Sequence, residues 1–149
     1  MKVLIDADGC PVVRIATDIA FKHDLEVVIC CDTAHIFNIE GAKVVTVGKG
    51  FDSADFALVN RVKKGDIVIS QDYGLASMCL AKGAKCINQS GKIYDENNID
   101  GLLMIRHENK KLLKSGKHIK GPSKRTNQDN TRFIENFTKL IMESKIESL

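Results

Sequence analysis

The sequence predicts an α/β fold of three layers, with helices on both faces of a mostly parallel five-stranded sheet. Short β-branched runs alternate with amphipathic stretches up to Ser90, an order that is typical of βαβ units with right-handed crossovers. The apolar runs are nearly continuous, as expected of strands that are covered on both faces. The predicted strands are Val3–Ile5, Leu25–Cys30, Lys43–Val47, Asp66–Ser70 and Ala84–Ile87.

Three helical patterns separate these strands. The first, Pro11–His23, begins with a proline, whose fixed φ and missing N–H suit a first turn. The second and third, Ser53–Lys63 and Gly74–Lys82, are each followed by a glycine (Gly65 or Gly83), and helices commonly end at glycine.

The pattern changes after the last predicted strand. Ile99–Lys114 is predicted to form a helix, and Asn127–Lys145 another, because their apolar residues recur at helical spacing. We expect residues 1–149 to form a single domain, in which about residues 99–149 are a basic helical extension.

Composition and the cysteines indicate a cytoplasmic globular protein. Hydrophobic content of 44% and charged content of 28% are those of an ordinary folded protein, not a disordered one. No apolar run approaches the roughly 18 residues of a membrane span, and Asp6 comes too early for a secretory leader. The five cysteines are odd in number and lack CxxC spacing, so free thiols are favoured over disulfides or a zinc site.

The net charge of +3 hides an uneven distribution along the chain. Residues 1–104 carry 11 Lys and Arg against 14 Asp and Glu, whereas residues 105–149 carry 11 against 5. This distribution is what we would expect if the acidic part of the chain bound a metal ion and the basic tail held an anionic polymer over it. A solvated helix face would show the same charge pattern, and charge alone leaves both interpretations open.

Five aspartates are predicted to meet at the carboxyl edge of the sheet, where open parallel sheets bind their ligands. Asp6 and Asp8 follow the first strand, Asp52 and Asp55 follow the third, and Asp72 follows the fourth. Such a cluster of like charges needs a cation or a proton to offset it. Carboxylate oxygens are suitable ligands for Mg²⁺ or Mn²⁺. Such an ion lowers the pKa of a bound water and stabilises charge on a phosphoryl oxygen, and phosphodiester hydrolysis requires both effects.

Each aspartate also has a structural interpretation as a helix cap. Asp6 and Asp8 precede a predicted helix, Asp72 precedes another, and Asp52 and Asp55 have the spacing of a capping box. Convergence of all five on one edge favours function over capping, most clearly for the closely spaced pair Asp6 and Asp8.

Several stretches of the chain match a known family of proteins: Asp6-Ala7-Asp8-Gly9-Cys10-Pro11-Val12, Gly50-Phe51-Asp52-Ser53-Ala54-Asp55, Gly65–Ala76, Asn98-Ile99-Asp100, Gly121-Pro122-Ser123-Lys124-Arg125-Thr126, Asp129 and Arg132-Phe133. In this order they resemble the YaiI/YqxD family of bacterial proteins, and the resemblance covers nearly the whole chain. Two departures are visible. Gly9 replaces the more usual Ala, and Lys, which lacks the bidentate fork of Arg, replaces Arg in the basic segment.

The resemblance implies a cytoplasmic protein with a PIN-nuclease-like fold and no established activity. By analogy with PIN-like nucleases, Asp6, Asp8, Asp55 and Asp72 would bind the metal, with Asp52 nearby in support.

The basic tail offers candidate phosphate ligands. Asp129 is expected either to orient one of its arginines or to join the acidic cluster. Alternatively, Thr126 or Asn127 caps the last helix and Asp129 favours its first turn. The candidate nucleic-acid-binding residues are Lys49, Lys120, Lys124, Arg125 and Arg132.

Three functions are therefore carried forward. The leading one is a Mg²⁺- or Mn²⁺-dependent nuclease acting on RNA or single-stranded nucleic acid, with Asp6, Asp8 and Asp72 as catalytic residues. The second is a phosphatase of the haloacid-dehalogenase type, with Asp6 as nucleophile and Lys82 or Lys85 as the required lysine. The third is a non-catalytic module that binds RNA or a protein partner.

Overall fold

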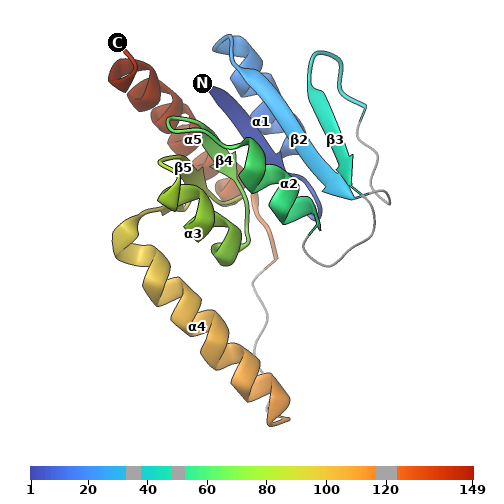
Figure 1. Cartoon of the computed structure of the whole chain (residues 1–149), viewed down its shortest axis with the longest axis vertical. Helices are drawn as coiled ribbons and strands as arrows, with labels where there is room; N and C mark the ends of the chain where they lie inside the picture. Colours follow the sequence, from blue (N-terminus) through green and yellow to red (C-terminus); the bar gives the residue numbers. More distant parts are fainter. Residues whose placement is uncertain (33–37, 48–52, 117–123) are drawn as a thin grey trace.

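A mostly parallel sheet runs through the middle of the molecule (Figure 1). The computed structural model describes residues 1–32, 38–47, 53–116 and 124–149, and for residues 53–55 it describes the backbone alone. Within these ranges six strands form the sheet in the order β3-β2-β1-β4-β5-β6. They are β1 (Lys2–Asp6), β2 (Glu26–Asp32), β3 (Lys43–Val47), β4 (Ile67–Ile69), β5 (Lys85–Ile87) and β6 (Ile93–Tyr94).

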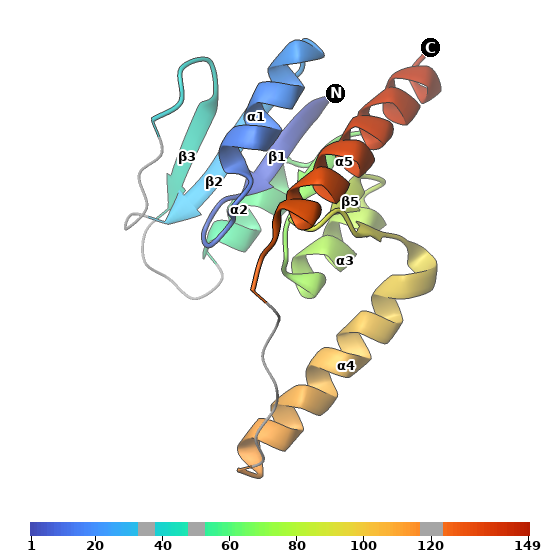
Figure 2. The same ribbon diagram turned by 180° about the vertical axis from the view of Figure 1, so that it is seen from behind.

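Helices cover both faces of this sheet (Figures 1 and 2). Side chains alternate between the faces along each strand, so Val3 and Ile5 of β1 enter one apolar core and Leu4 enters the other. The first core is closed by α1 and α5, and the second by α2, α3 and the beginning of α4. The helices are α1 (Val13–Lys22), α2 (Ser53–Arg61), α3 (Tyr73–Ala81), α4 (Glu96–Lys114) and α5 (Asn127–Glu147).

The predicted α/β class is confirmed, and every predicted strand and helix has a counterpart. The described sheet has one strand more than the five predicted. The additional strand, β6, was not predicted because it has only two residues, and it pairs antiparallel with β5. The helix predicted to begin at Ile99 begins earlier, at Glu96. Asp95 caps it by accepting from the N–H groups of Asn97 and Asn98, and Asn98 accepts from Asp95 in return.

The direction of winding reverses between β1 and β4, and this reversal positions the site. The chain builds outward from β1 through β2 to β3 and then returns to add β4 and β5 on the other side of β1. Neighbouring loops diverge at such a point and leave a crevice at the carboxyl ends of the two strands. Asp6 ends β1, and Ser70 follows β4 at this crevice.

Helix α4 leaves the body of the molecule after its first turns. Ile99 is buried in the core and Leu102 and Leu103 pack against it, but every residue from His107 to Gly116 is exposed. Both views show this half of the helix projecting past the carboxyl ends of the strands (Figures 1 and 2). No helix in the described ranges is both long enough and apolar enough to span a bilayer.

Candidate acidic site at the carboxyl edge of the sheet

An open pocket of about 460 Å³ lies at the crevice between β1 and β4. Asp6 and Asp8 come from the end of β1 and the turn after it, and Asp72 comes from the turn that leads from β4 into α3. The structure therefore brings together the three predicted catalytic aspartates. The pocket is lined by Asp6, Asp8, Gln71, Asp72, Tyr73 and Arg106.

Ser70 connects the two strand ends beneath the pocket. Its hydroxyl donates to Oδ2 of Asp6 at 2.8 Å and accepts from the backbone N–H of Asp72 at 3.0 Å. The side chain is buried, and Tyr94 donates to its carbonyl at 3.2 Å. Sequence reasoning overlooked Ser70, although its position directly after a buried strand is the same signal that singled out Asp6.

Asp8 ties the turn after β1 to the end of β2. Its two carboxylate oxygens accept from the backbone N–H of Asp32 at 3.1 and 3.3 Å. Gly9, which follows it, has a φ of +72°, and an added Cβ would lie 3.2 Å from Nε2 of Gln71. A residue with a side chain would be strained in this turn, so glycine suits the local backbone.

Asp72 is both a helix cap and a pocket residue. Its Oδ1 accepts from the N–H groups of Gly74 at 2.9 Å and Leu75 at 3.2 Å, which confirms that it caps α3. The same oxygen accepts from Arg106 at 3.2 Å. The side chain remains 33% exposed, so the cap leaves part of the carboxylate open to the pocket.

Arg106 is a charged pocket residue that the sequence analysis did not single out. It comes from α4 and reaches Asp72 across 34 positions of sequence, with its side chain 41% exposed. Gly74 leaves room for it, since a Cβ there would lie 3.3 Å from Nη1 of Arg106. The neighbouring ring of Tyr73 is held edge-on by Tyr94, with centroids 5.8 Å apart.

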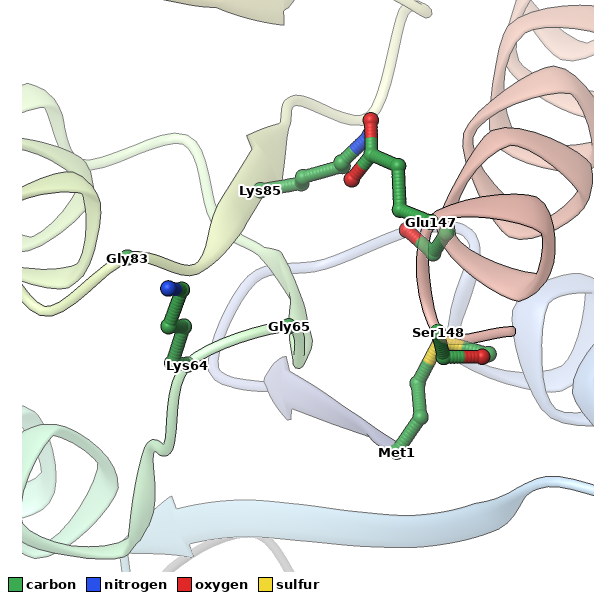
Figure 3. Close-up of a pocket in the computed structure, with 8 residues that line it drawn as sticks. Met1, Lys64, Gly65, Gly83, Lys85, Glu147 and Ser148 are labelled. Carbon is green, nitrogen blue, oxygen red and sulfur yellow. The ribbon is translucent and has the colours of Figure 1, made fainter.

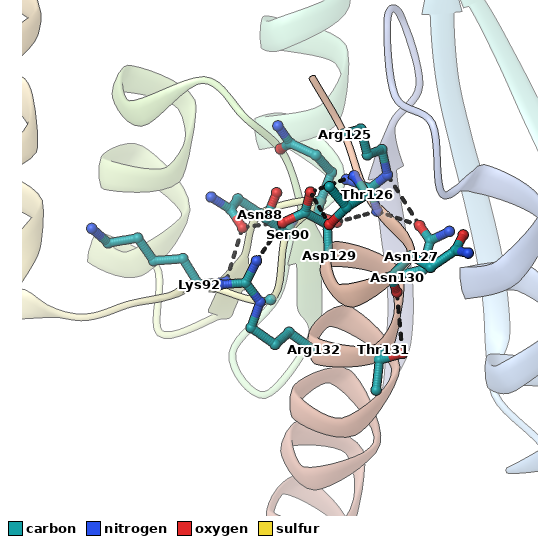
Figure 4. Close-up of polar contacts among 12 residues, drawn as sticks. Asn88, Ser90, Lys92, Arg125, Thr126, Asn127, Asp129, Asn130, Thr131 and Arg132 are labelled. Carbon is teal, nitrogen blue, oxygen red and sulfur yellow. Dashed lines mark hydrogen bonds and ion pairs between the residues drawn. The ribbon is translucent and has the colours of Figure 1, made fainter. Parts of the chain in front are cut away.

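Two of the predicted phosphate ligands in the tail, Arg125 and Arg132, have partners within the protein (Figure 4). Arg125 donates through Nη2 to the carbonyl of Gln89 at 2.7 Å and through Nε and Nη2 to Asn130 at 3.0 and 2.6 Å. Arg132 pairs with Asp129, although its side chain is 60% exposed. Arg125 therefore joins the turn before β6 to the first turn of α5.

Asp129 belongs to the beginning of α5. Its Oδ2 accepts from the backbone N–H of Thr126 at 2.8 Å and from the hydroxyl of that residue at 3.3 Å. The hydrogen bond from the Thr126 backbone lowers the pKa of Asp129, with Arg132 adding to the effect. The capping interpretation is confirmed, and Asp129 is not among the described residues that line the acidic pocket.

Four predicted site residues lie wholly or partly outside the part of the chain that the structure describes. Lys49, Asp52 and Lys120 lie outside the described residues, and Asp55 lies in the first turn of α2, where the side chain is not described. Lys124 is described and exposed.

The chemistry of the pocket suits a divalent cation, because carboxylate oxygens are hard ligands. Among the described residues, however, no three His, Cys, Asp or Glu side chains are grouped as metal ligands.

All five cysteines are thiols rather than disulfides, as predicted, and burial raises the pKa of Cys10.

A second pocket, of about 330 Å³, lies at the opposite, amino edge of the sheet (Figure 3). It is lined in part by Lys64, Gly65 and Gly83, and its Lys85 pairs with Glu147 at 3.0 Å and Glu143 at 3.9 Å. The ion pair between Lys2 and Asp66, at 2.7 Å, lies at the amino end of the strands.

Fold and pocket together define an α/β protein with an acidic pocket at the reversal point of a mostly parallel sheet. Residues 4–143 match the model of the family described as "Uncharacterized BCR, YaiI/YqxD family", and the chain belongs to this family. No solved structure matches the chain.

Relatives of similar length are proteins designated UPF0178. The one from Clostridium acetobutylicum is 47% identical over 148 residues, which cover 98% of this chain and 100% of the relative. The one from Exiguobacterium sibiricum is 47% identical over 143 residues, 96% of this chain and 98% of the relative. That from Clostridium tetani is 45% identical over 145 residues, 97% of this chain and 99% of the relative. These designations name no activity.

Proposed function

We propose that this protein is a divalent-metal-dependent nuclease that acts on RNA or single-stranded nucleic acid. The observation that supports the proposal is the pocket lining: Asp6, Asp8 and Asp72 face one pocket, and Arg106 lines it with them. Carboxylates able to hold a cation and a guanidinium able to hold a phosphate are the two kinds of group that phosphodiester cleavage needs. The PIN-like arrangement implied by the family resemblance is part of this proposal.

Asp6, Asp8 and Asp72 would hold Mg²⁺ or Mn²⁺, joined by Asp55 from the first turn of α2. When bound, such an ion makes a nearby water more acidic and offsets charge on a phosphoryl group. Ser70 orients Asp6 by donating to one of its oxygens. The cap bonds from Gly74 and Leu75 hold Asp72 in place without covering it completely.

The phosphatase alternative has less support from the geometry. Such an enzyme needs a lysine beside the first aspartate, but Lys82 donates to the carbonyl of Val59 and Lys85 pairs with Glu147. Neither lysine is among the described residues that line the acidic pocket.

The non-catalytic alternative is favoured by one observation. Asp72 already has a structural role, because it caps α3 and pairs with Arg106. A binding module would keep these contacts and would need no cation.

A cleavage assay on a labelled single-stranded RNA, with Mg²⁺ or Mn²⁺ and with EDTA, tests the proposal. Asp6→Asn and Asp72→Asn keep the size of each side chain, and asparagine remains a good helix cap, so both variants should fold. We expect cleavage by the wild type to need the metal and to fall at least about 100-fold in either variant. Calorimetric titration with Mn²⁺ gives a second readout and should show weakened binding in both variants.

Asp18→Asn is the matched control, because Asp18 is an exposed carboxylate on α1. It should cleave RNA and bind Mn²⁺ like the wild type. Equal cleavage by wild type, Asp6→Asn and Asp72→Asn would reject the proposal. Salt-sensitive RNA binding without any turnover would support the non-catalytic module, and release of phosphate from small phosphomonoesters would support the phosphatase.

A further inference from the structure

Helix α4 carries a row of cations that continues outward from the acidic pocket. Arg106 lines the pocket, and Lys110 and Lys114 follow it at intervals of four residues along the helix. Residues four apart lie on neighbouring turns of the same side, and each step rises about 6 Å along the axis. The three side chains therefore form one ridge, which we call the α4 ridge.

Burial shows which way this ridge faces. Arg106 is partly covered, whereas its neighbours Ile105 and His107 are exposed. The side of α4 on which Arg106 lies is thus turned toward the body of the protein. Lys110 and Lys114 are rotated from Arg106 by only about 40° and 80°, so they extend that side into the projecting half of the helix.

The acidic side chain on this half of α4 lies away from the ridge. Between Arg106 and Gly116 the one acidic residue is Glu108, which is rotated about 200° from Arg106 and so lies on the far side of the helix. Lys110 and Lys114 are exposed, and neither forms an ion pair with another described residue. By contrast, Arg125 and Arg132 in the tail have protein partners. Among the described residues, Arg106 is the cation that lines the acidic pocket, and Lys110 and Lys114 continue from it along α4.

The ridge also offers apolar contact. Leu113, 61% exposed, lies about 20° from Arg106 around the helix, and Tyr73 lines the pocket at the other end. Apolar and aromatic side chains of this kind contact the faces of bases, which are accessible only when the bases are unpaired. Positive groups accompanied by an apolar side chain on one helix face, with an aromatic ring at the pocket, suit a single strand better than a duplex.

We propose that the α4 ridge is the track along which single-stranded nucleic acid reaches the acidic pocket. This inference rests on the proposed function, since it names the strand that the pocket would cleave. Lys110 and Lys114 contact successive phosphates outside the pocket. Arg106 contacts the phosphate that enters it, exchanging its single bond to Asp72 for bonds to phosphate oxygens while Asp72 stays bound to Gly74 and Leu75.

Binding without turnover tests the track separately from cleavage. Fluorescence anisotropy with a labelled single-stranded RNA is measured in EDTA over a series of salt concentrations, for wild type and for Lys110→Gln/Lys114→Gln. Glutamine has a helix propensity close to that of lysine, so α4 should be retained, and circular dichroism verifies this. We expect the double variant to bind about 10-fold more weakly at low salt, and its slope of log affinity against log salt to be smaller by about 1.4, or 0.7 for each phosphate that a lysine no longer neutralises.

Lys139→Gln is the matched control, because Lys139 is an exposed lysine on α5. It should retain the affinity and the salt slope of the wild type. A double variant that binds RNA with wild-type affinity and slope would overturn the track, as would a duplex of the same sequence binding more tightly than the single strand. Binding that depends on the ridge in a protein that cleaves nothing would leave the track intact and reject the nuclease.

Discussion

Ser70 donates a hydrogen bond of 2.8 Å to the carboxylate of Asp6, although 64 positions separate the two residues. The same hydroxyl accepts from the backbone of Asp72, so one small buried side chain sets the relative positions of two aspartates in the pocket. Asp6 ends β1, and Asp72 lies in the turn after β4, a neighbouring strand that runs in the same direction as β1. The pocket therefore depends on the pairing of β1 with β4 as much as on its own lining.

Replacing Ser70 with alanine removes the donor to Asp6 and leaves the N–H of Asp72 without its acceptor. Because the site is buried, we expect the free energy of unfolding to fall by about 2 kcal/mol, measured by urea denaturation. Ser148→Ala, at an exposed serine near the carboxyl terminus, should change it by less than about 0.5 kcal/mol. Equal stability of Ser70→Ala and the wild type would mean that the hydroxyl does not join the strand ends.

Two substitutions at Asp72 separate its cap from its charge. Asp72→Ala should lower the free energy of unfolding by about 1 kcal/mol because α3 loses its cap, whereas Asp72→Asn should change it by only a few tenths. Losing the ion pair with Arg106 adds little in either variant, because both side chains are partly exposed. If Asp72→Asn proved as destabilising as Asp72→Ala, the charge and not the cap would be the stabilising feature.

Gly91 lies directly against the beginning of α5. A Cβ at this position would be 2.6 Å from the carbonyl oxygen of Arg132, and Asn136 donates to the Gly91 carbonyl at 2.7 Å. Gly65 has the same φ of +90° but open space around it. We expect Gly65→Ala to cost about 1 kcal/mol from backbone strain alone.

Gly91→Ala should lower the free energy of unfolding by about 2 kcal/mol more than Gly65→Ala does, because α5 must move away from the turn that contains residue 91. Thermal denaturation of the two variants in parallel separates the effect of the contact with α5 from the effect of backbone strain. Equal melting temperatures would show that the close approach of Gly91 to Arg132 does not contribute to stability.

Burial raises the pKa of Cys30 to about 11 from its ordinary value of 9.0. The folded protein therefore holds this proton more tightly than the unfolded chain does. The resulting stability is fully present well below pH 9 and is lost as the pH rises toward 11, by an amount on the order of 3 kcal/mol for a pKa raised from 9.0 to about 11. Cys30→Ala should be less stable at neutral pH because it leaves a cavity, but its free energy of unfolding should decline less steeply between pH 9 and 11. Parallel pH curves for the two proteins would contradict the shift.

Much of this molecule follows from local sequence pattern. Buried strands such as Val3–Ile5 are continuous apolar runs, and the repeat of Phe133 and Phe137 marks the buried side of α5, because packing on both faces of a sheet leaves a periodic record in the chain. The common direction of parallel strands was enough to predict that Asp6, Asp8 and Asp72 share one edge of the sheet, and all three line the pocket there.

The tertiary structure decided which groups meet, and the sequence could not show this. Arg106 reaches Asp72 because α4 packs beside α3, and Arg125, just before α5, reaches the carbonyl of Gln89 in the turn before β6. No spacing rule predicts a hydrogen bond across 34 or 36 residues, since its geometry depends on the packing of every side chain between the partners. Local periodicity thus determines the elements, and packing determines the partners of their charges.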